Sequence, residues 1–94
     1  MTIKDRILKH VNEKNWTQQC FARNASGAPV SFLSPQATKW CLSGHIERWY
    51  DLGEITTKEL LEFYRKFAEV TDSIIAKYND THTFEQVMEA VRKC

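Results

Sequence analysis

Apolar and polar positions alternate with the period of an α-helix over most of the chain. Residues 3–14 carry one apolar stripe behind Thr2, a residue type that commonly caps helix N-termini. Two capping boxes, each a hydroxyl residue followed three positions later by Glu or Gln, predict further helix starts at Thr56 and Thr83. Between these two starts the pattern predicts a break near position 72 and a short helix over residues 72–78.

A central helix is expected over residues 35–51. Ser34-Pro35 supplies a hydroxyl cap followed by proline at the first helical position, and the pattern ends before Gly53. Only a narrow stripe of this helix is polar, and a helix that is apolar on most sides is surrounded by other elements. Gly44 lies in its middle, where glycine lowers stability by about 1 kcal/mol relative to alanine. We therefore expect a neighbouring backbone to approach closely at Gly44.

Residues 18–32 have a different pattern. Short runs of alternating residues flank Gly27, and Pro29 would confine the second run to the edge of a sheet. The pattern predicts a short β-hairpin or an ordered loop. This segment must lie on the helices, because an isolated hairpin is only marginally stable in water. Its expected anchors are Trp16, Phe21, Val30 and Phe32.

The predicted fold is mainly α, with about five helices around the central helix (35–51) and the hairpin or ordered loop (18–32) packed on one side. Residues 1–94 are expected to form a single domain, because a chain of this length leaves no room for two. The 43% content of hydrophobic residues is enough for a packed core and argues against disorder.

The net charge, the apolar runs and the cysteine content limit which partners and which cellular locations are expected. The net charge is +1, so nothing draws the whole chain toward nucleic acid or acidic membranes, although residues 1–50 carry +4 and residues 51–94 carry −3. We expect no membrane span and no signal peptide, because apolar runs are short and charges are spread through the first residues. Three cysteines without a C-x-x-C motif favour reduced thiols and a cytoplasmic location.

Cys41 and His45 are the first candidates for chemistry. They are four positions apart on the expected helix and could form a thiolate–imidazole pair, although no third member of a catalytic triad is evident. The alternative, a buried cysteine that packs as a small apolar group, is favoured. Structural zinc requires four ligands in close-spaced pairs, and the chain offers only this one pair. We therefore predict no catalytic residue, no metal and no cofactor.

Two other residue groups could bind something. Asn79 and Asp80 lie in an expected interhelical loop, where they either cap helices or, together with Arg23 and Trp40, line a pocket for a small ligand. Aromatic residues are more numerous around the later helices than one side of a small core needs. They either belong to the core or form an exposed patch for a partner or a second copy of the chain. This aromatic set consists of Trp49, Tyr50, Phe63, Tyr64 and Phe67.

The chain contains the pattern W…G-x-P…W-C-x-x-G…N-D…T-x-x-x-V over about residues 16–91. In this order of residues it resembles a family of small uncharacterised bacterial and bacteriophage proteins, filed as a domain of unknown function. Two positions depart from it, since His45 replaces the usual alanine and Tyr78 the usual tryptophan. The resemblance implies a shared fold and a phage or bacterial origin, and it brings no activity. The matching residues are Trp16, Phe21, Ala22, Arg23, Gly27, Pro29, Ala37, Trp40, Cys41, Gly44, Asn79, Asp80, Thr83 and Val87.

These observations together predict a non-catalytic binding protein of phage or prophage type. It would dock on a host protein, with counter-defence as one such role, or associate with itself. The first alternative is binding or sequestration of a small polar ligand such as a nucleotide signal. The second is an enzyme that depends on Cys41. Neither a membrane nor nucleic acid is expected as a partner.

Overall fold

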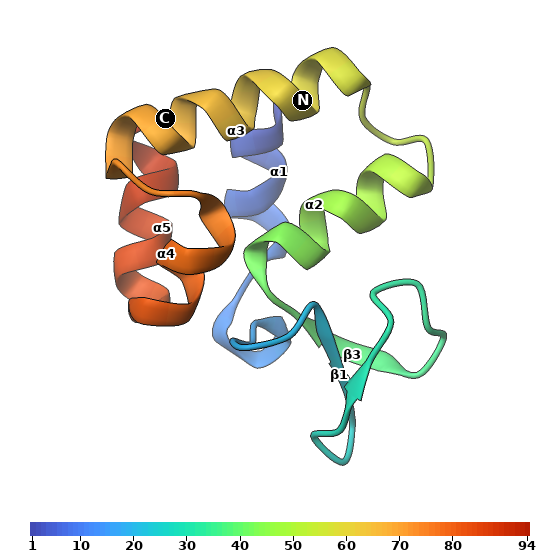
Figure 1. Cartoon of the computed structure of the whole chain (residues 1–94). Helices are drawn as coiled ribbons and strands as arrows, with labels where there is room; N and C mark the ends of the chain where they lie inside the picture. Colours follow the sequence, from blue (N-terminus) through green and yellow to red (C-terminus); the bar gives the residue numbers. More distant parts are fainter.

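The computed structural model describes all residues, 1–94, and contains five α-helices and a small sheet (Figure 1). The sheet has three antiparallel strands in the order β2-β1-β3. The fold is therefore dominated by helices but mixed α/β, rather than mainly α with a hairpin. A 3₁₀ helix, Glu13–Asn15, follows the first helix. The elements are α1 (Ile3–His10), β1 (Ala22–Asn24), β2 (Pro29–Val30), β3 (Ala37–Trp40), α2 (Leu42–Asp51), α3 (Thr57–Thr71), α4 (Ile75–Thr81) and α5 (Phe84–Arg92).

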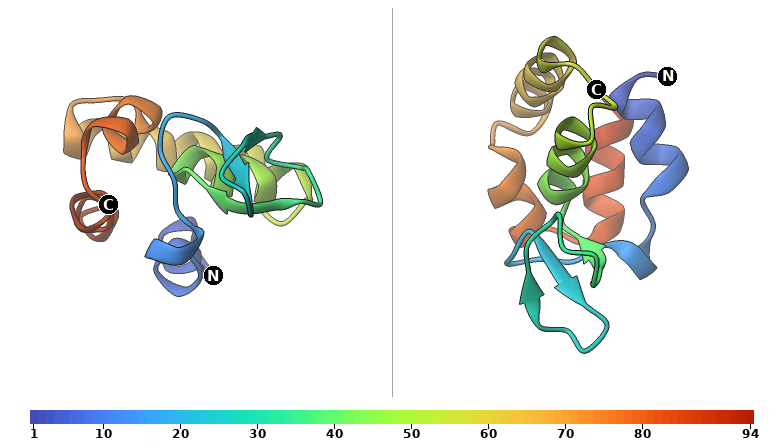
Figure 2. Two further views of the ribbon diagram at one scale, coloured as in Figure 1. Left: turned by 90° about the horizontal axis from the view of Figure 1, so that it is seen from below. Right: turned by 90° about the vertical axis from the view of Figure 1, so that its right-hand side faces the viewer.

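The helices form two layers. Helices α2, α3 and α4 face the viewer in Figure 1, and α1 and α5 lie behind them, as the turned views of Figure 2 show. The sheet projects from one end of this arrangement, below α2. The chain leaves the helices after the 3₁₀ helix, forms the sheet, and returns directly into α2.

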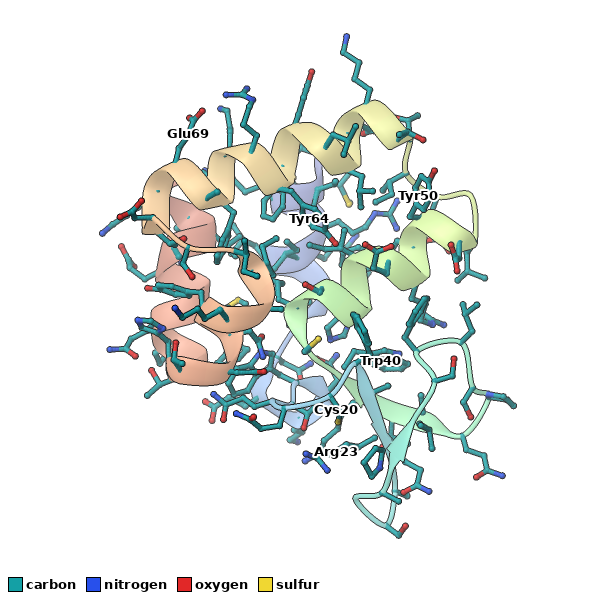
Figure 3. All side chains as sticks on the ribbon, viewed as in Figure 1. Cys20, Arg23, Trp40, Tyr50, Tyr64 and Glu69 are labelled. Carbon is teal, nitrogen blue, oxygen red and sulfur yellow. The ribbon has the colours of Figure 1, made fainter.

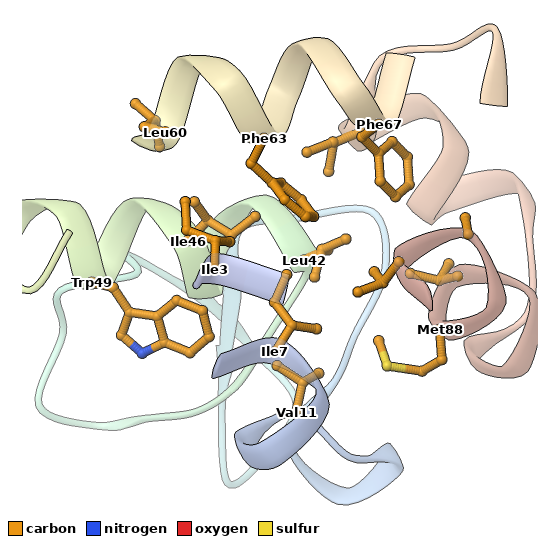
Figure 4. Close-up of a cluster of buried hydrophobic side chains, with 14 of the residues drawn as sticks. Ile3, Ile7, Val11, Leu42, Ile46, Trp49, Leu60, Phe63, Phe67 and Met88 are labelled. Atoms are coloured by element: carbon orange, nitrogen blue, oxygen red, sulfur yellow. The ribbon is translucent and has the colours of Figure 1, made fainter. Parts of the chain in front are cut away.

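The core lies between the two helical layers (Figure 4). Helices α1, α2, α3 and α5 each contribute several apolar side chains to one cluster of buried residues. Burying one such side chain stabilises the fold by about 1.5–3 kcal/mol, so this cluster is the main source of stability. The cluster contains Ile3, Ile7, Val11, Leu42, Ile46, Trp49, Ile55, Leu60, Phe63, Phe67, Ile75, Val87, Met88, Ala90 and Val91.

The predicted helix starts are confirmed by their capping hydrogen bonds. The hydroxyl of Thr2 accepts a hydrogen bond from the Asp5 amide, and Thr56 and Thr83 each form a complete capping box. The break predicted near position 72 is also confirmed, because Asp72 takes the left-handed conformation (φ +54°) that ends α3. The first helix is shorter than predicted and ends at His10, after which Asn12 caps the 3₁₀ helix.

The prediction of one helix over residues 35–51 is wrong in its first part. Residues Ala37–Trp40 form strand β3, which pairs with β1 through Ala22↔Trp40 and Arg23↔Lys39. Ser34-Pro35 begins a turn instead, closed by a hydrogen bond of 3.1 Å from the Ala37 amide to the Ser34 carbonyl. Serine before proline suits the start of a turn as well as the start of a helix, so local sequence did not decide between them.

The hairpin between β1 and β2 is confirmed, with Pro29 on an edge strand as predicted. The close approach at Gly44 is confirmed as well, because a Cβ atom there would collide with the carbonyl oxygen of Phe21. Helix α2 is also surrounded where the pattern predicted it, since the six residues from Cys41 to Ile46 are all buried. The sheet and α2 are thus joined by a contact that no larger residue at position 44 would permit.

Candidate functional site

Asn79 lies inside α4 and is fully buried, so the prediction that it ends the helix is wrong. Its Oδ1 atom accepts hydrogen bonds from the indole N–H of Trp16 (2.7 Å) and from the backbone N–H of Leu42 (3.0 Å). Its Nδ2 atom donates to the carbonyl of Thr17 at 3.0 Å. One amide side chain therefore joins the segment that enters the sheet, the first residue of α2, and α4.

The neighbouring residue Asp80 fixes the same entering segment. Its Oδ1 atom accepts a hydrogen bond of 2.8 Å from the backbone N–H of Gln19, which has the uncommon φ of +73°. Gln18 donates through Nε2 to the carbonyls of Asn79 (2.8 Å) and His82 (2.7 Å) at the end of α4. These bonds satisfy carbonyl groups that a helix end leaves without partners.

Arg23 and Trp40, the other predicted ligand residues, are also engaged in internal contacts (labelled in Figure 3). The guanidinium of Arg23 donates to the Thr17 hydroxyl (2.9 Å) and to the carbonyls of Gln18 (3.1 Å) and Gly27 (2.9 Å). The indole N–H of Trp40 donates to the Phe32 carbonyl at 3.0 Å. Arg23, Asn79 and Asp80 thus meet around residues 17–19, where they hold the base of the sheet.

A polar hollow of about 550 Å³ adjoins this network. Asp80 is the only one of the four predicted ligand residues that lines it. Glu13 lines it too, so two carboxylates face the space and would repel a phosphate group. The residues predicted for a nucleotide-like ligand therefore do not form a pocket of the required charge.

Cys41 and His45 do not form a catalytic pair. The Cys41 sulfur accepts the capping hydrogen bond from the Gly44 amide (3.2 Å), and burial raises the pKa of its thiol. The His45 ring lies against Trp40 and bonds through Nε2 to the Asn15 carbonyl at 3.0 Å, which makes Nε2 the protonated nitrogen. Burial lowers the pKa of His45 to about 4, so the ring is neutral near pH 7. No hydrogen bond joins the two side chains, and a thiol with a raised pKa is a poor nucleophile.

The predicted aromatic patch is largely part of the core. Trp49, Phe63 and Phe67 are buried in the apolar cluster, because α2 and α3 turn these positions inward. Tyr50 and Tyr64 are half-buried at its margin, with their hydroxyl groups bonded to Thr57 (2.8 Å) and Glu47 (2.7 Å) respectively. The five residues therefore do not form one exposed surface.

The sequence did not reveal an apolar groove where α2, α3, α4 and the segment before β1 meet. We call it the Phe21–Ile74 groove, after the two large exposed apolar residues that line it. Its volume is about 270 Å³, and six of its eight lining residues are hydrophobic. Phe21 is 51% exposed and Ile74 is 68% exposed, so the predicted anchor Phe21 does not insert into the core. The groove is lined by Phe21, Ser43, Glu47, Tyr64, Ala68, Ile74, Ile75 and Ala76.

Two structural results limit the other kinds of site. No three His, Cys, Asp or Glu side chains lie together in a way that could hold a metal ion. None of the helices has the length and apolar character needed to cross a membrane.

Comparisons of the chain with protein-family models, curated proteins and solved structures found no match.

Proposed function

We propose that this chain is a non-catalytic binding protein that docks on another protein through the Phe21–Ile74 groove. The observation that carries the proposal is the position of two large exposed apolar side chains beside an apolar hollow. Clustered apolar surface of this kind marks interaction sites, whereas single exposed apolar residues do not.

The groove suits an anchoring side chain from a partner. Binding energy at protein interfaces concentrates in a few side chains that fill well-packed pockets. Three of the lining residues, Tyr64 and Ala68 of α3 and Ile75 of α4, belong to helices that contribute side chains to the core. Covering Phe21 and Ile74, each of which is half exposed or more, would add about 1–2 kcal/mol per residue to the stability of a complex.

The nature of the partner follows from the expected origin of the chain. The resemblance to small bacterial and phage proteins supports a phage-type or prophage-type origin, and for a binding protein of that origin we propose a host protein as the partner, with counter-defence as one such role. Cys20, Cys41 and Cys94 are all free thiols, which supports a reducing compartment such as the cytoplasm. The alternatives of a nucleotide-like ligand and a Cys41-dependent enzyme receive no comparable support from the site geometry described above.

Site-specific photo-crosslinking in bacterial cells tests the proposal. A photoreactive amino acid is placed at position 74 or, as a control, at position 52, because Leu52 is 52% exposed and lies outside the groove. We expect a host protein that crosslinks from position 74 and not from position 52. The purified partner should then bind the wild-type chain and lose binding to Phe21→Ser. Equal crosslinking from both positions, or unchanged binding by Phe21→Ser, would contradict the proposal.

A further inference from the structure

One charged side chain lines the otherwise apolar Phe21–Ile74 groove. Glu47 of α2 is the only charged residue among the eight that form it. Its Oε1 atom accepts a hydrogen bond of 2.7 Å from the Tyr64 hydroxyl, which holds the carboxylate at the groove. Burial and the nearby Glu47 raise the pKa of Tyr64, so the phenol keeps its proton and remains the donor.

This carboxylate has no cationic partner within the chain. The three ion pairs of the structure are Arg6–Glu54, Arg65–Glu69 and Arg92–Glu89, and none of them involves Glu47. A purely apolar partner would cover a charge that is already half-buried and would remove its remaining water. Covering a charge without an opposite charge is unfavourable, whereas a hydrogen bond between ionised groups is among the stronger ones.

We infer that the partner presents a large apolar side chain with a lysine or arginine beside it. The apolar side chain fills the groove and covers Phe21 and Ile74, and the cation bonds to the free oxygen of Glu47. The inference rests on the proposed function and adds the chemistry of the bound segment. Glu47 would then determine which apolar segments are accepted, because segments without a cation leave the carboxylate unpaired.

A random 12-residue peptide display library, panned against the full chain, provides the probe. We expect the enriched peptides to carry Lys or Arg next to a large apolar residue and to lose binding to Ile74→Ser. They should still bind Leu52→Ser, the matched exposed control. Glu47→Gln keeps an acceptor for the Tyr64 hydroxyl while it removes the charge, and should weaken these peptides about ten-fold. Replacing the peptide's basic residue by methionine should remove that dependence on Glu47.

The outcomes separate the two levels of the proposal. Peptides that depend on Ile74 but show no basic residue, and that bind Glu47→Gln equally well, would overturn the inference and leave the proposed function standing. If no enriched peptide depends on Phe21 or Ile74, both are overturned. Analytical ultracentrifugation addresses a second copy of the chain as the occupant. A dimer that Ile74→Ser abolishes would show self-association and overturn both the foreign partner and its basic residue.

Discussion

Replacing Asn79 by alanine should destabilise the protein more than the loss of a single hydrogen bond would. The substitution removes the acceptor for the Leu42 and Trp16 N–H groups and the donor to the Thr17 carbonyl. A buried polar group left without a partner costs about 1–3 kcal/mol. Leu42 is fully buried, and the other two groups are half-buried and reach water more easily. We therefore expect a loss of about 3–5 kcal/mol, a large part of the 5–15 kcal/mol typical of a domain.

Urea-induced unfolding at pH 7, followed by tryptophan fluorescence, measures this loss. Trp16→Phe removes only the hydrogen bond from the indole N–H to Asn79 and should cost about 1 kcal/mol, which provides a milder variant if Asn79→Ala does not fold. Lys77→Ala is the matched control on the same helix, because Lys77 is exposed and should change stability by less than about 0.5 kcal/mol. An Asn79→Ala protein within about 1 kcal/mol of wild type would refute the view that this amide holds the three segments together.

Three further predictions follow from the same region. Gly44→Ala should cost about 1–3 kcal/mol in urea unfolding, because its Cβ collides with the Phe21 carbonyl; an unchanged midpoint would contradict that contact. The pKa of His45 is about 4 in the folded state and 6.5 ordinarily. Between pH 4 and 6.5 the ring is therefore protonated in the unfolded chain but neutral in the folded one. Stability from this group is present above about pH 6.5 and falls toward pH 4 by at most about 3 kcal/mol, and His45→Gln should flatten that slope of unfolding free energy against pH. Cys41 should react with a thiol reagent at least ten times more slowly than Cys20 in the native protein, because it is buried and its pKa is raised; equal rates would show that position 41 is open.

Elements whose signals are local could be predicted from the sequence. The capping boxes at Thr56 and Thr83 depend on residues three positions apart, and the structure forms both. The close approach of a backbone at Gly44 was predictable, because glycine inside an apolar helix lowers stability unless a neighbour requires the space. That neighbour is the carbonyl of Phe21. Residues 37–40 could not be assigned locally, since they become a strand only when β1 pairs with them. Ser34-Pro35 suits a turn and a helix start equally, so the strand pairing decided between them.

The site was less predictable than the fold. The partners of Asn79 are 37 and 63 positions away in the sequence, and no local pattern indicates such distances. The groove brings together Phe21, Tyr64 and Ile74, which belong to three separate segments. Phe21 was expected to anchor its segment on the helices, because a hydrophobic residue in a short segment gives no sign of which side it presents; it is instead half exposed. Of the two interpretations left open for the aromatic set, the core one holds for Trp49, Phe63 and Phe67, which turn inward.

The chain departs for the sheet at Trp16 and comes back at Leu42, and the same amide of Asn79 binds both points. The backbone N–H of Thr17 also donates a hydrogen bond to the carbonyl of Trp40 (3.2 Å), which holds the two ends of the sheet segment together. Lengthening the turns of the sheet should therefore change the stability of the protein little, because the entropy cost of closing a loop grows only slowly with its length. The turns around residues 25–28 and 31–36 could thus be lengthened or exchanged with the helices left intact, so that the far end of the sheet varies while the scaffold stays the same.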